Sequence, residues 1–253
     1  MPRFAGCMIC AEQRWAVPTL RDSKLRQAAP DLRKYLSMKT LVKQLVEFTA
    51  FLVVLPAYGL YRLGAAIAGA DKAFPGWSQT FSLLPGLTGQ YLRRAFYSLT
   101  LKRCGEDTCL SFGAIFSHST ASVGANVYVG SFCSLGAITL EDDVLIASNV
   151  SIMNGTQQHG TARIDIPIRE QPGIFTPVTI GEGSWIGEGA TVSADVGKHC
   201  VIGAGAVVTK PVPDYAVALG VPAKVVKFRN EEVPIEQKLA EAERLVKSAT
   251  DAS

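Results

Sequence analysis

The sequence predicts an all-β solenoid, a parallel β-helix of triangular cross-section, and three features of residues 109–228 predict it. Aliphatic residues recur six positions apart, glycine often follows them, and a small or β-branched residue stands four positions after them. A period of six fits neither the turn of an α-helix nor the alternation of a flat strand. Self-similarity of this kind indicates coils that stack on one another.

The aliphatic positions form two arms, in which eight of the ten steps are six residues long. Seven of the twelve positions are followed by glycine, which we expect to supply turn angles that other residues resist. Each hexad should form one short strand and one turn, and three hexads should close a coil whose inward side chains stack on the next. We therefore predict four to five coils, built on Val123, Val129, Leu135, Leu140, Ile146 and Ile152, and then on Ile180, Ile186, Val192, Val196, Ile202 and Val208.

The remaining segments have other compositions. Residues 1–37 are polar and mixed, and are expected either to be poorly ordered or to precede a true start at Met38. Residues 38–108 predict an apolar, helical N-terminal extension. Residues 229–253 predict a C-terminal helix and tail, because Ile235, Leu239 and Val246 share one helical face.

Residues 48–60 form an uninterrupted apolar run, FTAFLVVLPAYGL. Three interpretations remain open: a helix packed on the rest of the protein, a helix at a membrane surface, and a true span. A span needs about 20 apolar residues, a length reached only by including Arg62 and Pro56, which should kink the helix. Peripheral membrane contact through residues 41–69 is therefore one expectation, and Lys43, Arg93 and Arg94 suit anionic lipid or solvent equally well.

Composition excludes several classes of function. A net charge of +3 and the lack of an arginine and aromatic stripe argue against nucleic-acid binding. The six cysteines show no disulfide framework, and the C-x-x-C pair of Cys7 and Cys10 has no second pair at zinc-binding spacing. The N-terminus lacks the apolar core of a signal peptide. We expect reduced thiols and a cytoplasmic protein, with membrane association as the alternative.

The motifs of the second arm carry a family resemblance. IGEGSWIGEGATV and VIGAGAVVTKPVPDYAVALGVPAKVV, between Ile180 and Val226, resemble the bacterial O-acetyltransferases of galactosides, maltose, serine or surface polysaccharide, as does LEDDVLIASNVSIMNGTQQHG upstream. The resemblance implies a left-handed β-helix, acetyl-CoA as co-substrate, and homotrimers with active sites between subunits. The lead-in SLLPGLTGQYLRRAFYSLTL is similar to the branch that acetylates sugars of exopolysaccharide or lipopolysaccharide.

A predicted loop, residues 153–177, separates the two arms and contains His159. The resemblance implies that a histidine on this loop is the general base. Histidine suits that role because it can take a proton from a hydroxyl near neutral pH and return it to a leaving thiol. His118 and His199 compete with it, and Asp142, Asp143 and Glu170 are candidates to orient its ring.

The resemblance also places the ligand-binding residues. Coenzyme A would contact Trp185, Ala204, Thr209, Lys210, Lys224 and Lys227, with the indole walling the pantetheine channel and lysines meeting phosphates as point charges. The polar side chains of Asn154, Gln158 and Arg163 are candidates to bind the acceptor. Cys133 and Cys200 occupy inward positions and are expected to be core residues.

These observations favour an acetyl-CoA-dependent O-acetyltransferase acting on a hydroxyl of a saccharide or of a polysaccharide or lipopolysaccharide precursor. An N-acetyltransferase acting on an amino sugar and a non-catalytic β-helical assembly module are the alternatives. A γ-type carbonic anhydrase would need a pair of closely spaced histidines. The three histidines lie 41 and 40 residues apart, so we predict no metal site.

Overall fold

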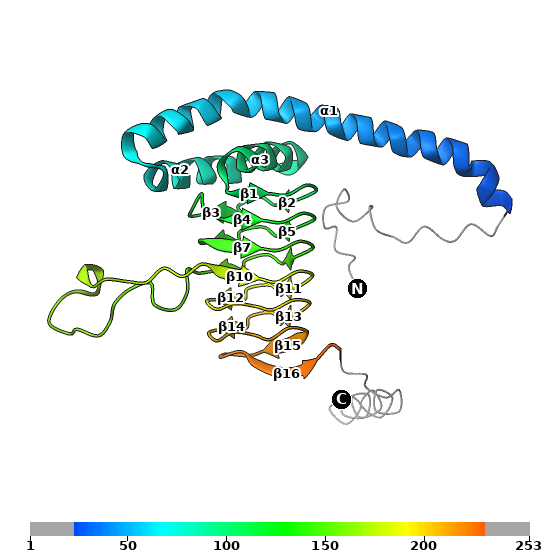
Figure 1. Ribbon diagram of the computed structural model, residues 1–253. Coiled ribbons are helices and arrows are strands. Elements are labelled where there is room, and N and C mark those ends of the chain that lie inside the picture. Colours follow the sequence, from blue (N-terminus) through cyan, green and yellow to red (C-terminus); the bar gives the residue numbers. More distant parts are fainter. Residues whose placement is uncertain (1–22, 231–253) are drawn as a thin grey trace, which may run out of the picture.

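A computed structural model of the chain describes residues 23–230, with the side chains of residue 38 and of residues 40–230. Three helices cover one end of a β-solenoid, and a long loop leaves the solenoid near its middle (Figure 1). The predicted helix in residues 229–253 and the Cys7 and Cys10 pair lie outside the described residues.

The helical cap consists of α1 (Ser23–Ala68), α2 (Ala70–Ser82) and α3 (Gly86–Thr100). Residues 23–37 form the first turns of α1, and residues 1–22 lie outside the described part of the chain. Pro56 does not interrupt α1; the helix curves over α2 and α3 with its convex side outward (Figure 1). Curvature around a proline is the usual response to its missing N–H and its bulky ring.

The solenoid has three sheets, and each coil contributes a strand or bridge to each of them. All pairs are parallel except β15 with β16, which is antiparallel. Sheet A contains β1 (Arg103–Cys104), β4 (Ser122–Val123), β7 (Ile138–Leu140) and β10 (Val178–Ile180). Sheet B contains β2 (Cys109–Leu110), β5 (Tyr128–Val129), β8 (Leu145–Ile146), β11 (Trp185–Ile186), β13 (Val201–Ile202), β15 (Ala216–Leu219) and β16 (Lys224–Phe228). Sheet C contains β3 (Ile115–Phe116), β6 (Ser134–Leu135), β9 (Ser151–Ile152), β12 (Thr191–Val192) and β14 (Val207–Val208).

The solenoid makes about six turns, more than the four to five coils predicted. The first coil begins at Arg103, ahead of the expected boundary at residue 109. Its inward positions keep the spacing of six but include Cys104 and Phe116, which a search for aliphatic residues passes over. Phe116 fits there because the Tyr97 ring of α3 packs against it, with ring centroids 4.9 Å apart.

The predicted inward ladder is confirmed. All twelve aliphatic positions are buried, each no more than 2 % exposed. Val123, Leu140 and Ile180 lie one above the other in sheet A, and the other two sheets carry equivalent columns. The small residues four positions later, including Cys133 and Cys200, are buried as well.

We expected the glycines that follow the ladder residues to supply unusual turn angles, and this expectation is wrong. None of the seven has a positive φ; the left-handed angles fall two residues later, for example at Asn126 and Phe132. What these glycines provide is room between coils. A Cβ at Gly130 would lie 2.5 Å from the carbonyl carbon of Ala147, and one at Gly187 would lie 2.5 Å from the backbone nitrogen of Ala204.

Arg93 joins the cap to the first coil. It is fully buried, its Nε donates to the Leu110 carbonyl at 2.9 Å, and its Nη1 donates to the Phe81 and Ser82 carbonyls at the end of α2. The carboxyl end of a helix carries partial negative charge, which stabilises the guanidinium. Arg93 is therefore unavailable to lipid, contrary to our expectation, and Arg94 forms an ion pair with Glu47 of α1.

A second polar contact joins the same elements. The Phe116 N–H donates to Ser78 Oγ at 2.9 Å, and Ser78 Oγ lies 2.8 Å from the Tyr97 hydroxyl. Burial raises the pKa of Tyr97 to about 12. The cap and the first coil thus share one core, and the cap closes a solenoid end that would otherwise expose unpaired strand edges.

The glycine contacts predict a specific stability difference. Gly130→Ala should lower the free energy of unfolding by about 1–3 kcal/mol, because its Cβ must displace backbone of the next coil. Gly59→Ala on α1 is the control, since a Cβ there meets nothing within 4 Å and alanine favours helix. Thermal unfolding followed by circular dichroism measures both. Equal stability of Gly130→Ala and the parent would contradict the close-stacking account.

Candidate active site

The loop of residues 153–177 is inserted between β9 and β10 without disturbing the coil register. Before it, β9 pairs with β12 through Ser151 and Thr191, and after it β10 pairs with β7 through Val178 and Ile138. The loop leaves from the corner between sheets C and A and extends away from the solenoid (Figure 1). Stacked coils therefore hold both of its ends, and loops on rigid scaffolds often carry function.

Close backbone pairing holds the base of the loop. The Thr176 N–H donates to the Asn154 carbonyl at 3.1 Å, and the Ile174 N–H donates to the Gln157 carbonyl at 2.7 Å. Gly173 is needed for this approach, because a Cβ there would lie 1.9 Å from the Gln158 carbonyl oxygen.

His159 follows this paired stem. Its side chain is exposed, and no described residue forms a hydrogen bond or ion pair with the imidazole. The ring is therefore available to an external partner.

Asn154 lies at the point where the loop leaves the coil. Its side chain is buried, Oδ1 accepts from the Ala137 N–H, and Nδ2 lies 3.1 Å from Nε2 of His118. Gly136 makes room for this amide, since a Cβ there would lie 2.0 Å from Asn154 Oδ1. The amide is engaged in anchoring the loop, so this geometry does not support the predicted contact between Asn154 and an acceptor.

The other two acceptor candidates lie farther along the loop. Gln158 donates to the Gly155 carbonyl at 3.3 Å, and its side chain is half-buried. Arg163 is exposed and pairs with Asp165, and the guanidinium holds the pKa of that carboxyl below its usual range. Sequence reasoning missed Gln171, a buried amide that accepts from the Arg163 N–H at 3.0 Å and donates to the Arg163 carbonyl at 2.7 Å. Gln171 thereby fixes the tip of the loop.

The candidates for orienting His159 are engaged elsewhere. Asp142 accepts from the Ala125 N–H at 2.8 Å and pairs with Arg103 at 3.2 Å, at the corner between sheets A and B. Asp143 lies at the same corner with a left-handed φ of 58°. Glu170, in the short 3-10 helix η1 (Ile168–Glu170), lies 3.6 Å from Arg169.

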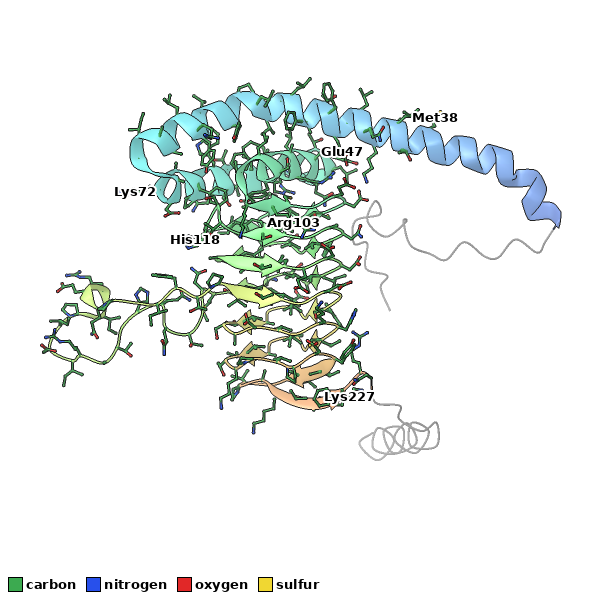
Figure 2. The ribbon with its side chains drawn as sticks, viewed as in Figure 1. Met38, Glu47, Lys72, Arg103, His118 and Lys227 are labelled. Carbon is green, nitrogen blue, oxygen red and sulfur yellow. The ribbon has the colours of Figure 1, made fainter. Side chains whose placement is uncertain are left out.

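The competing histidines have structural surroundings. The His199 ring stacks on Tyr215, with centroids 5.4 Å apart, and its carbonyl accepts from Arg229. His118 contacts Asn154 at the same corner as the loop, and it is labelled at the side of the solenoid in Figure 2. Only His159 combines an exposed ring with a place on the inserted loop.

The six predicted coenzyme A residues lie on more than one side of the solenoid. Trp185 is exposed on sheet B, and Ala204 is exposed at the corner between sheets B and C. Thr209 and Lys210 follow β14 at the corner between sheets C and A, on the side from which the loop departs. Lys224 and Lys227 lie on β16, paired with Leu219 and Val217. Within one chain, the structure does not bring the sheet B residues to His159.

Sheet B carries an apolar outward column that sequence reasoning missed. Each of its members immediately precedes an inward residue, and the register stacks them as Tyr128, Leu145, Trp185, Val201 and Val217. The equivalent column of sheet A is polar, with Ser122, Thr139 and Thr179. The signal was readable in the sequence, at the position before each ladder residue. The loop also exposes apolar side chains, at Ile164, Ile168, Ile174 and Phe175.

The ladder cysteines are not suited to nucleophilic chemistry. Burial raises the pKa of Cys133 to about 11 and also raises the pKa of Cys200. The Cys133 thiol donates to the Ala147 carbonyl at 3.1 Å. Among the described residues, no group of three His, Cys, Asp or Glu side chains is placed to hold a metal ion.

A hexapeptide-repeat family model, described as the hexapeptide repeat of succinyl-transferase, matches residues 120–153 and 177–210, on either side of the loop. The chain is 33 % identical over 135 residues to galactoside O-acetyltransferase of Escherichia coli K12, covering 50 % of this chain and 64 % of that protein. It is 32 % identical over 136 residues to the putative lipopolysaccharide biosynthesis O-acetyl transferase WbbJ of the same organism, covering 50 % and 66 %. The match thus spans slightly less than two thirds of each relative.

Solved structures show the same fold. A maltose O-acetyltransferase from Clostridium difficile 630 has a TM-score of 0.56 at 22 % identity, covering 66 % of this chain and 91 % of that one. The hexapeptide-repeat acetyltransferase VCA0836 of Vibrio cholerae, in complex with acetyl-CoA, has a TM-score of 0.55 at 19 % identity, covering 66 % and 92 %. The solenoid is a left-handed parallel β-helix, as these neighbours are. The chain is thus similar to the hexapeptide-repeat acetyltransferases, and the two halves of the solenoid on either side of the loop carry the similarity.

The Cys133 environment predicts low reactivity. A pKa of about 11, against an ordinary value near 9, leaves about 100-fold less thiolate near pH 8, so alkylation by iodoacetamide should be at least about 100-fold slower in the folded chain than in urea. The rate should rise with pH up to about 11. Mass spectrometry of the peptide containing Cys133 measures it, and equal rates in folded and unfolded chains would refute its place in the core.

Proposed function

We propose that this chain is an acetyl-CoA-dependent O-acetyltransferase, with His159 as general base and a hydroxyl of a saccharide, or of a polysaccharide or lipopolysaccharide precursor, as acceptor. The observation that carries the proposal is the position of His159: an exposed imidazole, without a hydrogen-bonding partner among residues 23–230, on the loop that interrupts a regular coil. The similarity to a galactoside O-acetyltransferase and to a lipopolysaccharide biosynthesis O-acetyl transferase supports the hydroxyl acceptor.

The proposed reaction is a direct transfer. His159 takes the proton of the acceptor hydroxyl as its oxygen attacks the thioester carbonyl carbon, which forms an oxyanion that backbone N–H groups can stabilise. The carbon–sulfur bond then breaks, and the protonated imidazole returns the proton to the thiolate of coenzyme A. No acyl-enzyme is needed, in agreement with the buried, weakly acidic thiols of Cys133 and Cys200.

The proposed site has two parts, the loop with His159 and the coenzyme A residues around Trp185, which we call half-sites. Their arrangement favours a homotrimer. His159 lies on the loop, whereas Trp185 lies on the apolar column of sheet B, and a single chain leaves both exposed. Exposed apolar patches of this kind mark interfaces. In the proposed trimer the loop of one subunit reaches the solenoid of the next. Coenzyme A then lies between them, in contact with Trp185, Ala204, Thr209, Lys210, Lys224 and Lys227.

The general-base assignment is tested by His159→Ala. Loss of the base should lower kcat about 10²- to 10⁴-fold with little change in the KM for acetyl-CoA, because the ring acts on the acceptor proton. Release of coenzyme A thiol from acetyl-CoA measures the rate with a panel of hydroxyl and amino sugars.

His199→Asn is the matched control. It removes a histidine held by stacking on Tyr215, and asparagine tolerates the left-handed backbone angle at that position. This variant should keep the parent's rate. Full activity of His159→Ala would overturn the assignment, transfer to amino sugars alone would replace the O-acetyltransferase by an N-acetyltransferase, and failure to bind acetyl-CoA in calorimetry would favour a non-catalytic assembly module.

The trimer is tested by Leu145→Glu. A carboxylate in the apolar column of sheet B should dissociate the trimer to monomers, because the charge would be buried without a partner. Light scattering coupled to size-exclusion chromatography gives the mass of each species. Gln79→Glu, which adds the same charge at an exposed position of α2, should leave the trimer intact. A monomeric parent would refute the proposed assembly.

A further inference from the structure

Helix α1 presents an unusual surface for a helix that lies on the outside of a protein. The segment Thr40–Ala68 is long and apolar enough to cross a membrane. Its most apolar stretch has a mean hydropathy of 1.6, yet only 17 % of that stretch is buried. The packed-helix interpretation of the apolar run therefore accounts for one narrow face of α1 and leaves the rest without an explanation.

The inward face of α1 carries two charged groups, Lys43 and Glu47. Ala50, Val54 and Tyr61 are buried against the cap, and Glu47 and Lys43 lie on the same face about one and two turns before Ala50. Lys43 forms an ion pair with Asp107 of the first coil, and Glu47 forms one with Arg94 of α3. Figure 2 shows Glu47 beneath α1, between it and α3.

The outward face is mostly apolar, with Gln44 and Arg62 exposed at its border. Steps of three or four residues, continued through Gly59, place one row of side chains along the convex side of the helix: Leu41, Leu45, Phe48, Leu52, Leu55 and Leu63. All of them are exposed, and Phe48, Leu52 and Leu63 are 61 %, 48 % and 59 % exposed. Arg62, at the flank, donates to the Tyr58 hydroxyl at 2.9 Å. A helix facing water normally has the opposite arrangement, with charges outward and apolar residues inward.

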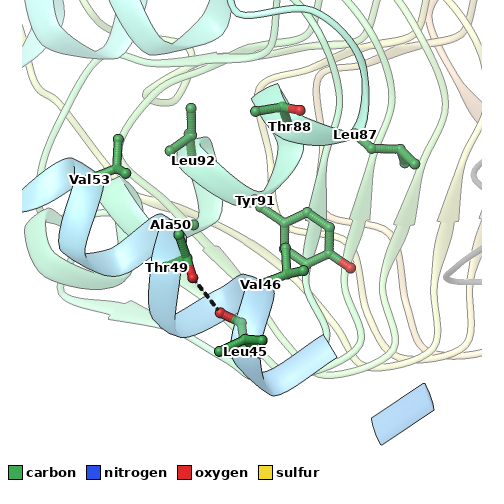
Figure 3. Close-up of a pocket in the computed structure, with 9 residues that line it drawn as sticks. All are labelled: Leu45, Val46, Thr49, Ala50, Val53, Leu87, Thr88, Tyr91 and Leu92. Atoms are coloured by element: carbon green, nitrogen blue, oxygen red, sulfur yellow. Dashed lines mark hydrogen bonds between the residues drawn. The ribbon is translucent and has the colours of Figure 1, made fainter. Parts of the chain in front are cut away.

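An apolar groove continues this surface between α1 and α3. It has a volume of about 430 Å³ and is lined by apolar side chains with two threonines, among them Leu45, Val46, Val53, Leu87 and Leu92 (Figure 3). Packing of the two helices does not close it. The uncovered apolar surface thus extends from the convex row of α1 to the start of α3.

The packing of α1 on the cap decides whether the helix could cross a lipid bilayer or lie in the plane of its surface. The helix lies across the top of α2 and α3, and its outward face looks along the solenoid axis, away from the loop and from sheet B (Figure 1). A helix crossing the bilayer would draw α2, α3 and their buried Arg93 into the hydrocarbon. A helix lying in the membrane plane immerses only its outward row.

We propose that the outward face of α1, with the groove beside it, is embedded in the interfacial layer of a lipid bilayer, with the helix parallel to the membrane and the solenoid standing away from it. The surface favours lipid over a soluble protein partner, because Lys43 and Glu47 are both turned inward and the outward row is a run of apolar side chains with polar groups only at its border, at Gln44 and Arg62. A second copy is disfavoured because the apolar column of sheet B points to the side, whereas this row points along the axis. The proposal does not depend on the proposed function.

Vesicle flotation of the full chain tests the proposal. The parent should float with vesicles of phosphatidylcholine alone, with little further gain when phosphatidylglycerol is added, because the embedded row is uncharged. Combining Phe48→Gln, Leu52→Gln and Leu63→Gln should lower the partition coefficient about tenfold or more. The thermal unfolding of this variant in solution should match the parent's, since the three side chains are largely exposed.

A second triple variant controls for general stickiness. Val221→Gln, Val225→Gln and Val226→Gln remove exposed apolar side chains from the end of the solenoid opposite the cap, and should leave flotation unchanged. The proposal is overturned if the α1 variant floats like the parent. It is equally overturned if the parent stays in solution as an oligomer whose mass changes in the α1 variant, because a second copy would then cover the face.

The depth of α1 separates an in-plane helix from a span. Tryptophan introduced at Leu41, Leu52 or Leu63 and quenched by brominated lipids should report the same shallow depth at all three positions. A deep position at residue 52 between two shallow ones would show a span and contradict the proposal. This measurement requires no acetyl-CoA or acceptor, so its outcome is separate from that of the transferase assays.

Discussion

The stacking of one coil on the next is the interaction on which the rest of this structure depends. A single coil cannot bury its own inward residue, and the aliphatic columns become a core only because parallel strands repeat in register. That register needs backbone to approach backbone at the corners, which explains the glycines next to the ladder. It also requires a cover at each end of the column: Arg93, Tyr97 and Phe116 join the helical cap to the first coil, and the antiparallel strand β16 covers the edge of sheet B at the other end.

The same regularity divides the molecule into surfaces with different roles. The coil continues undisturbed past the loop, so the loop can carry His159 without a cost to the core. The apolar column of sheet B points to the side, and the apolar row of α1 points along the axis. In the proposed trimer, subunits related by side contacts would hold their three α1 helices at the same end. Three modest lipid contacts on one face would then act together, which raises avidity far above that of one helix.

Much of the fold could be predicted from the sequence, because residues that stack from one coil to the next recur at a fixed spacing. Every ladder position from Val123 to Val208 is buried as predicted.

The number of coils was underestimated because the first coil uses Cys104 and Phe116 under the cap. The reason for the ladder glycines was wrong because their constraint is contact with another coil, which spacing does not reveal. The same limit hid the contact between His118 and Asn154, two residues 36 positions apart, and the burial of Arg93. For the candidate site, the sequence placed His159 on the inserted loop, and the resemblance implied active sites between subunits. Neither showed on which face of the solenoid Trp185 lies, because that depends on how the coils close. The outward column of sheet B and the one-sided charges of α1 were present in the sequence and needed only to be read on the correct face.

The central claim is that a regular solenoid presents two half-sites that only neighbouring subunits combine. Mixed trimers test it most directly: His159→Ala and Trp185→Ala chains, each defective alone, are co-expressed with different tags and purified for the presence of both. If His159 of one subunit works with Trp185 of the next, mixed trimers contain one intact site and should recover a substantial fraction of the parent's acetyl transfer. Mixed trimers no more active than the two separate variants would contradict the account.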